Sequence, residues 1–241
     1  MPAVQTRASY HHGALREELI KATVALIEAE GIGAVSLRRV ARAAGVSPGA
    51  PYHHFADRSA LLAAIAAQGH QILEHRLRRA REQAPTAVAA LGAMIETYVA
   101  FARDHPAHIH LMLRGELAQM DKSPQTQSAG EGAIQLLTEV VQDCQREGSA
   151  PPGDPTPLVA TIWALSVGIV TLWLDGPLEG RCVTLGTTPE ELTTQIADLL
   201  ETLLTRRPDA SNPAQATSGA QSAANQPGAQ SKPAIRPAPP T

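Results

Sequence analysis

Residues 36–55, SLRRVARAAGVSPGAPYHHF, combine side chains that can hydrogen-bond phosphates and base edges with the spacing of two short helices. Apolar residues recur every three or four positions between Leu37 and Ala44, as on the buried face of a helix. Gly45 stands where a left-handed residue ends a helix most easily, and Ser47 and Pro48 are typical first residues of a second helix. Two short helices joined in this way are a helix-turn-helix, whose second helix enters the major groove. The segment therefore predicts binding to double-stranded DNA.

Ten side chains in and beside this motif are predicted to contact DNA. Arg38 extends from the first turn of the first helix, where an arginine can bind a guanine edge or a phosphate; a solvated side chain is the alternative. Small residues at the tip of the second helix let it enter the groove, and His53 can hydrogen-bond a base or a phosphate. For Ser36 the alternative role is helix capping alone, and for His54 the alternative role is packing beside Phe55. The ten are Ser36, Arg38, Ser47, Pro48, Gly49, Ala50, Tyr52, His53, His54 and Arg58.

The elements that must position these side chains are all predicted to be helices. Apolar spacing predicts a helix from about Gly13 to Glu30, and a long helix that Asp57 caps and that ends before Pro85. The chain shows no strand alternation and no internal repeat. Further helices are predicted at 86–104, 106–120, 134–146, 158–174 and 188–207, with loops at 122–132, 149–157 and 175–188. The fold class is therefore all-α, a three-helix N-terminal head followed by a C-terminal helical domain, with about nine helices.

Composition divides the chain into four parts. Residues 1–10 are predicted to be a flexible arm, residues 11–57 the helix-turn-helix domain, and residues 58–207 one helical domain. Residues 208–241 contain almost no large apolar side chain. Such a segment cannot bury enough surface to offset its chain entropy, so it is predicted to be a disordered tail.

The bulk composition limits the functions that fit. The net charge is -3 at pH 7, but basic side chains gather in the first quarter of the chain, so the local potential still suits DNA. Cys144 and Cys182 fit no zinc-binding spacing and follow no secretory signal, which predicts free thiols in the cytoplasm. The uncharged run 158–174 is shorter than the roughly 20 residues of a membrane span. It is predicted to be a helix buried on most sides, in a core or a subunit interface, and no membrane contact is expected.

Neither catalysis nor a cofactor is predicted. The chain has no GxSxG, no HExxH and no phosphate-binding glycine loop, so an enzyme with an appended helical head is the less favoured alternative. His105, His108 and His110 form a dense cluster, in which His-x-x-His spacing places two imidazoles on one helix face. Together with Asp104 they would make a weak metal site. A solvated helix start with one histidine packed inside is the favoured interpretation, so no metal is predicted.

The head resembles the TetR family of bacterial transcriptional regulators. The resemblance covers residues 10–65, where the helix-turn-helix, a following Tyr-x-x-Phe and an acidic-basic-x-x-Leu-Leu step into the next helix occur together. The N-terminal YHHG-x-L-R and the segment IWALSVGIVTLWLDG, with Trp163 and Gly168, are similar to the subgroup with a WHG-type C-terminal domain. This chain has Val167 where that signature has its histidine.

The resemblance implies a homodimer that presents two DNA-binding heads to a two-fold symmetric operator, with Tyr52 contacting a backbone phosphate. In that family the last two long helices of each subunit form a four-helix interface, which corresponds here to about 157–175 and 189–206. The run 158–174 is apolar on more faces than one subunit can easily cover, which agrees with this arrangement. The predicted interface residues are Leu158, Trp163, Gly168, Leu192, Ile196, Leu199 and Leu203.

The resemblance also implies a regulator, usually a repressor, whose C-terminal domain binds an unknown small-molecule effector. Helical domains bind apolar ligands between helices, with a few polar groups for orientation. The predicted lining is Met94, Tyr98, Met112, Leu137 and Trp163, and ordinary core packing is the alternative for each. A DNA-binding regulator without ligand control is the alternative function, although the large body argues against it.

Overall fold

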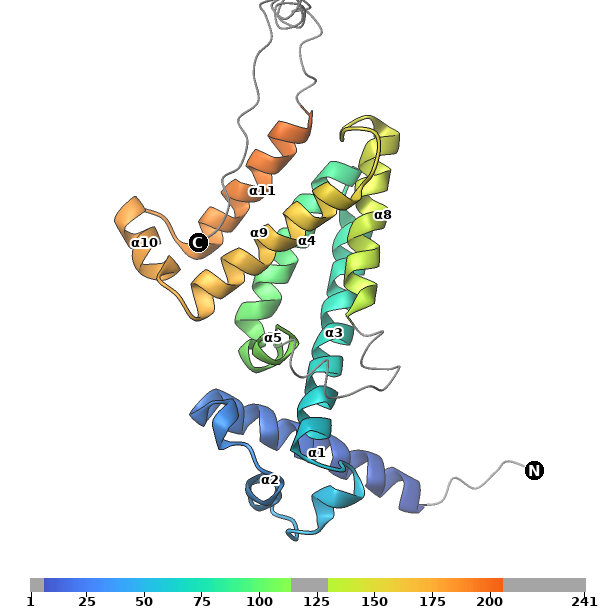
Figure 1. The fold of residues 1–241 in the computed structure, drawn as a ribbon, viewed down its shortest axis with the longest axis vertical. Helices are drawn as coiled ribbons and strands as arrows, with labels where there is room; N and C mark the ends of the chain where they lie inside the picture. The colour runs from blue at the N-terminus through green and yellow to red at the C-terminus, as the bar shows by residue number, and fades with distance from the viewer. Residues whose placement is uncertain (1–6, 114–129, 206–241) are drawn as a thin grey trace, which may run out of the picture. The chain divides into compact units, whose positions relative to one another are not determined.

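The structure is a computed structural model that describes residues 7–113 and 130–205, with side chains from Ala14 onward. Every regular element in these ranges is helical, as the sequence predicts, and none of the described residues is in a strand (Figure 1). The α-helices are α1 (Arg7–Glu30), α2 (Leu37–Ala43), α3 (Arg58–Gln83), α4 (Ala87–Asp104), α5 (Pro106–Met112), α8 (Glu131–Glu147), α9 (Thr156–Leu174), α10 (Leu178–Leu185) and α11 (Pro189–Thr205). Two short 3-10 helices, η1 (Ile32–Ala34) and η2 (Ala50–His53), lie in the head. The predicted tail 208–241 lies outside the described residues.

The head is built from α1, α2, η2 and the first turns of α3. Its core contains Leu19, Val40, Phe55 and Leu61, which are all buried. Local residues set the helix ends as predicted, because the Ser36 hydroxyl accepts from the backbone N–H of Arg39 and the Asp57 carboxylate accepts from that of Ala60. These caps and the shared core hold the helix-turn-helix together.

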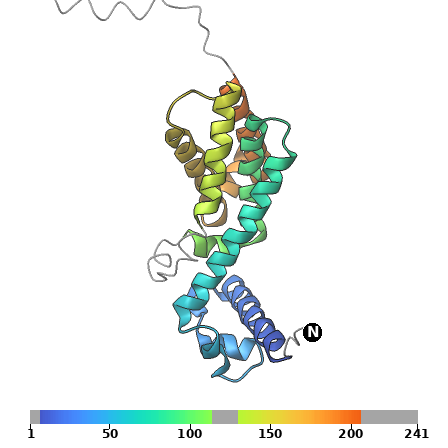
Figure 2. The same cartoon turned by 90° about the vertical axis from the view of Figure 1, so that its right-hand side faces the viewer.

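Helix α3 belongs to two hydrophobic cores. Leu61 and Ile65 lie in the head core, whereas Leu73 and Leu77 lie in the core of the body. At 1.5 Å per residue, the 26 residues of α3 extend about 39 Å. Figure 2 shows this helix running from the head into the body. Consequently, the described residues, 7–113 and 130–205, belong to one compact unit, and the chain contacts do not separate the head from the body.

The body packs around α4, which contacts α3, α5, α8, α9 and α11. Ten residues of α4 are buried, so this helix is apolar on most of its faces. Gly92 allows α11 to approach closely, since a Cβ at this position would lie 3.4 Å from the Cβ of Ala197. Helix α4 is therefore the centre about which the other helices of the body are placed.

Helices α8 and α9 begin at Glu131 and Thr156, a few residues before the predicted 134 and 158 and inside the predicted loops 122–132 and 149–157, and two other boundaries differ more. Helix α1 begins at Arg7 rather than near Gly13, so residues 7–10 of the predicted arm are helical. Residues 7–12 include neither proline nor glycine, and one glycine inside a helix, Gly13, costs only about 1 kcal/mol. Helix α5 ends at Met112 and Leu113 is a turn, although the helix was predicted to reach about Met120. The rest of that prediction lies outside the described residues.

The predicted loop at 175–188 was wrong, because it contains helix α10. Pro177 precedes the helix, and Gly186 ends it in the left-handed conformation with φ of 70°. A proline before the start and a glycine after the end are typical helix boundaries, so the sequence carried the signal. Leu178 and Cys182 share one helix face, and Cys182 is buried. Both Cys144 and Cys182 are free buried thiols.

Helix α9 is less buried than the sequence analysis predicted. By length and composition it could cross a membrane, and 28% of its most apolar window is buried within the chain. The buried residues are Val159, Ile162, Ser166, Ile169 and Val170, which occupy one side of the helix. Helix α9 is therefore apolar on more sides than the described chain covers, and its place in a subunit interface stays a prediction.

Candidate nucleic-acid interface and internal cavity

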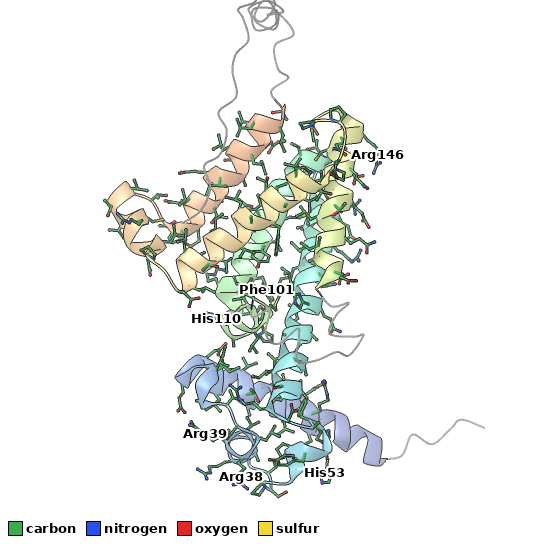
Figure 3. The ribbon with its side chains drawn as sticks, in the orientation of Figure 1. Arg38, Arg39, His53, Phe101, His110 and Arg146 are labelled. Atoms are coloured by element: carbon green, nitrogen blue, oxygen red, sulfur yellow. The ribbon has the colours of Figure 1, made fainter. Side chains whose placement is uncertain are left out.

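The first helix of the motif exposes its basic side chains. Arg38 is exposed and has no hydrogen bond or ion pair within the described part of the chain. Arg39, beside it, donates from Nη2 to both carboxylate oxygens of Glu30 at 2.7 and 2.8 Å. Figure 3 shows Arg38 and His53 at the same end of the head, on the side away from the body. Arg38 is thus available to an approaching DNA, whereas Arg39 is engaged by Glu30.

The second half of the motif is a 3-10 turn rather than the predicted short α-helix. Helix η2 begins at Ala50, and the Ser47 side chain makes no capping bond; the Ser47 carbonyl accepts from the Ala50 N–H at 3.0 Å. Pro51 explains the difference. A proline has no N–H, and in an α-helix its ring would clash with the carbonyl four residues earlier, which is that of Ser47. The capping role of Ser47 and the first-turn position of Pro48 are therefore corrected.

The side chains of this turn form a small surface with two larger groups. Pro48, Gly49 and His53 are exposed, and Tyr52 is 55% exposed. A Cβ at Gly49 would meet no heavy atom within 4 Å, so the backbone itself is open to an approaching groove. Ala50 and His54 are half-buried. This arrangement brings the predicted groove-facing residues together, and their contacts with DNA stay predictions.

Phe55 anchors the turn to the head. Its ring is 4% exposed and the guanidinium of Arg16 lies 5.4 Å from the ring centroid. The Phe55 N–H donates to the Pro51 carbonyl at 2.9 Å. The packing of Phe55 therefore fixes where Tyr52 and His53 project.

Arg58 has a role that the sequence pattern did not predict. Its Nε donates to the Val35 carbonyl at 2.9 Å, and its Nη2 donates to the Ile32 carbonyl at 2.7 Å. Both carbonyls belong to the segment between α1 and α2, so Arg58 ties the start of α3 to the segment that leads into Ser36. A phosphate contact by Arg58 stays a prediction beside this structural role.

An internal cavity of about 180 Å³ lies in the body, between α3, α4, α5, α8 and α9. All five residues predicted to line a ligand site line this cavity: Met94, Tyr98, Met112, Leu137 and Trp163. Its walls are otherwise mostly apolar, and the exposed Leu113, Ile134 and Trp163 mark where it opens. Apolar cavities of roughly 150 Å³ can hold a benzene ring, so a small apolar molecule fits this space. Ligand binding by these residues stays a prediction.

Two polar groups of the cavity were missed by the sequence analysis. His70 lies three and seven residues before Leu73 and Leu77, and this shared helix face was the available signal. Ser166 lies one turn after Ile162, and its hydroxyl donates to the Ile162 carbonyl at 2.8 Å. Burial lowers the pKa of His70 and raises the pKa of Tyr98 to about 12. Both side chains are therefore neutral at pH 7.

The clustered histidines point to separate partners. His105 Nε2 lies 3.0 Å from Arg76 Nη2, and His110 Nδ1 lies 3.6 Å from an Asp175 carboxylate oxygen. His108 is buried, with Nε2 3.4 Å from Gln68 Oε1, and burial together with the neighbouring His105 lowers its pKa to about 4. No group of metal-ligating side chains converges in the described ranges. His108 is the histidine packed inside that the favoured interpretation expected.

The predicted interface residues divide into two groups. Trp163, Leu199 and Leu203 are more than half exposed, at 52%, 56% and 58%. Leu158, Gly168, Leu192 and Ile196 are half-buried, and Leu158 and Ile196 also pack against the core of the body. Leu172, Val183 and Leu185 are further exposed apolar side chains that the sequence analysis did not single out. An uncovered apolar surface thus extends over α9, α10 and α11.

Together, a helix-turn-helix head and a helical body with an internal cavity define a DNA-binding regulator. Residues 19–65 match a family model described as bacterial regulatory proteins, tetR family, and residues 91–200 match one described as a tetracyclin repressor-like C-terminal domain. The chain belongs to the TetR family of transcriptional regulators. Neither description mentions a WHG signature, so the subgroup stays a prediction.

Several solved structures share this fold. A protein of unknown function from Rhodococcus sp. RHA1 is 34% identical, with 82% of this chain and 98% of that chain covered and a TM-score of 0.70. A tetR-family regulatory protein from Rhodococcus RHA1 is 18% identical, with 80% and 98% covered and a TM-score of 0.64. The regulator FadR from Bacillus subtilis, solved in complex with stearoyl-CoA, is 18% identical, with 79% and 99% covered and a TM-score of 0.63.

Proposed function

We propose that this protein is a homodimeric repressor that binds a two-fold symmetric operator and is released when a small molecule occupies the cavity. The observation that carries the proposal is that one helix serves both sites. Leu61 and Ile65 of α3 lie in the head core, and Leu73 and Leu77 of the same helix line the cavity. A ligand that changes the position of this wall also changes the position of the head.

A second connection runs through α5. Ala107 and Leu111 pack in the head core, while Ile109 packs in the core of the body. Met112 lines the cavity and packs against both cores. The fit against α3 is close, because a Cβ at Gly69 would lie 2.6 Å from the Met112 sulfur. Such packing does not deform continuously, so a ligand touching Met112 favours one arrangement of head and body over another.

Release from DNA is then a shift between two populations. Both heads bind only when they match half-sites about one helical turn apart. A ligand that binds more tightly to the arrangement in which the heads do not match the half-sites will reduce operator affinity. The reduction is limited by the ratio of the ligand's affinities for the two arrangements. The FadR structure with stearoyl-CoA supports the idea that this fold accepts a lipophilic ligand.

A second copy of the chain accounts for the exposed apolar surface. The outer sides of α9 and α11 expose Trp163, Leu199 and Leu203, and burying such side chains stabilises an interface by about 25 cal/mol per Å² of apolar area. Helix α9 then faces a partner subunit and not a membrane. The protein is proposed to act in the cytoplasm, where its operator is accessible.

The experiment that tests the proposal is selection of DNA from a random pool by the purified full-length protein, read by sequencing. We expect a two-fold symmetric site with half-sites about one helical turn apart. A screen of small molecules for release of that site then tests ligand control. Recovery of no specific site by folded dimer at low salt would overturn DNA-binding regulation, and a site that no cavity ligand releases would leave a regulator without ligand control.

A further inference from the structure

The described residues that line the cavity in the body carry no formal charge. Among the described residues that line it, none is Lys, Arg, Asp or Glu. The described side chains of the lining that can hydrogen-bond through oxygen or nitrogen are His70, Tyr98, Ser166 and, through its indole N–H, Trp163. The first two are neutral at pH 7 because burial disfavours their charged forms, lowering the pKa of His70 and raising that of Tyr98 to about 12. The lining therefore offers hydrogen bonds but no counter-charge.

This lining discriminates against ions. Moving a carboxylate or an ammonium group from water into an apolar site costs several kcal/mol unless a partner of opposite charge receives it. Here the aliphatic side chains of Leu73, Met94, Ile95 and Ile162 border the space, and no described cation or anion lines it. An uncharged ligand avoids this cost and still gains the benefit of burial.

Of the two hydroxyls among the described lining residues, that of Tyr98 is the one left to donate to a ligand. The Ser166 hydroxyl already donates its proton to the Ile162 carbonyl at 2.8 Å. The Nδ1 atom of His70 is fully buried and unpaired, so no solvent-sized group reaches it. The Tyr98 hydroxyl has no hydrogen bond to any residue in the described ranges, and a neutral phenol donates one proton.

We propose that the effector is an uncharged, largely apolar molecule with one carbonyl or hydroxyl oxygen, which accepts a hydrogen bond from Tyr98. This inference rests on the proposed function, because it specifies the ligand of the same cavity. The cavity of about 180 Å³ takes the polar end and the first carbons. A longer apolar chain leaves between Leu113, Ile134 and Trp163, which are 40%, 37% and 52% exposed.

The test uses three probes with the same ten-carbon chain: decan-1-ol, decanoate and decylammonium. Binding to the full-length protein is followed at pH 7.5 by tryptophan fluorescence, since Trp163 lines the cavity, and by thermal unfolding. We expect decan-1-ol to bind at least tenfold more tightly than either ion, because only the ions lose hydration without a counter-charge.

Two variants locate the hydrogen bond. Tyr98→Phe should weaken decan-1-ol binding about threefold to tenfold, the range of one neutral hydrogen bond, and should not change decanoate binding. Thr138→Val is the matched control. It also removes one hydroxyl from the body, which donates to the Ile134 carbonyl, but Thr138 does not line the cavity. We expect this control to bind decan-1-ol like the wild type.

The outcomes separate this inference from the proposed function. An ion that binds as tightly as decan-1-ol, or a Tyr98→Phe variant that binds decan-1-ol like the wild type, would overturn the inference while ligand control stands. Binding as expected with no change in operator affinity would support the ligand class and overturn ligand control. If a folded protein that binds its operator takes up none of the probes, both the inference and the effector cavity are overturned.

Discussion

Replacing Arg58 with alanine should destabilise the head, because this side chain holds the backbone that precedes α2. Its two hydrogen bonds, 2.9 Å to the Val35 carbonyl and 2.7 Å to the Ile32 carbonyl, join segments more than 20 residues apart. A hydrogen bond from a charged donor contributes about 1.5–3 kcal/mol. Arg58 is half-buried, so water compensates part of this loss, and we expect a total of about 2–3 kcal/mol.

Urea unfolding followed by circular dichroism, at one fixed protein concentration, measures this change. In thermal unfolding it corresponds to a decrease in Tm of about 4–12 °C for a chain of this size. Arg38→Ala is the matched control in the same head. Arg38 is exposed and has no partner in the described ranges, so its unfolding free energy should stay within about 0.5 kcal/mol of the wild type while operator affinity falls.

Equal unfolding free energies for Arg58→Ala and the wild type would refute this reasoning. The salt dependence of operator binding tests whether Arg58 also contacts a phosphate. Each lost phosphate contact reduces the slope of log affinity against log salt by about 0.9. A reduced slope in Arg58→Ala would support the phosphate contact that the sequence predicts, in addition to the structural role.

Three further predictions test other parts of the structure. Gly45→Ala should lower the unfolding free energy by about 1–2 kcal/mol, because φ at Gly45 is 70°, a left-handed conformation that alanine disfavours. Gly49→Ala is the control: φ at Gly49 is −85°, so the unfolding free energy should stay unchanged in the same urea assay. By light scattering we expect a dimeric wild type and a monomeric double variant Leu199→Glu, Leu203→Glu; an unchanged molar mass would exclude these residues from the interface. The pKa of His108 is lowered to about 4 from 6.5, so the unfolded state binds more protons than the folded state between these pH values. The unfolding free energy should therefore fall by about 3 kcal/mol as the pH decreases from 6.5 to 4. His108→Gln should lose most of this pH dependence in urea unfolding, and a variant that keeps all of it would show that another group is responsible.

Much of the head could be predicted because its determinants are close together in the chain. The Ser36 and Asp57 caps each involve a backbone N–H three residues later. Gly45 ends α2 through its own positive φ. The same local rules, applied to Pro177 and Gly186, would have identified α10. The second half of the motif departs from the predicted α-helix because Pro51 would clash with the Ser47 carbonyl.

The residues of the candidate sites were predicted only in part, because spacing along the chain does not show which helix faces meet. Helical spacing placed Met94, Tyr98, Met112, Leu137 and Trp163 on apolar faces, and these faces converge on one cavity. Spacing alone could not show that His70 and Ser166 join them, because a polar residue on an apolar face is equally compatible with a satisfied core position. The two carbonyl partners of Arg58 could not be predicted either, since they precede it by 23 and 26 residues.

The sequence by itself determined the helical class, the helix-turn-helix and most helix ends, because each depends on residues within about one helical turn of one another. Only the tertiary structure decided that α3 and α5 each pack in both cores, that the described lining of the cavity is uncharged, and that α9 leaves most of its apolar surface uncovered by the described chain. These properties depend on which faces of distant helices meet. Packing determines those contacts, and it depends on the shapes of all the helices together rather than on any one segment.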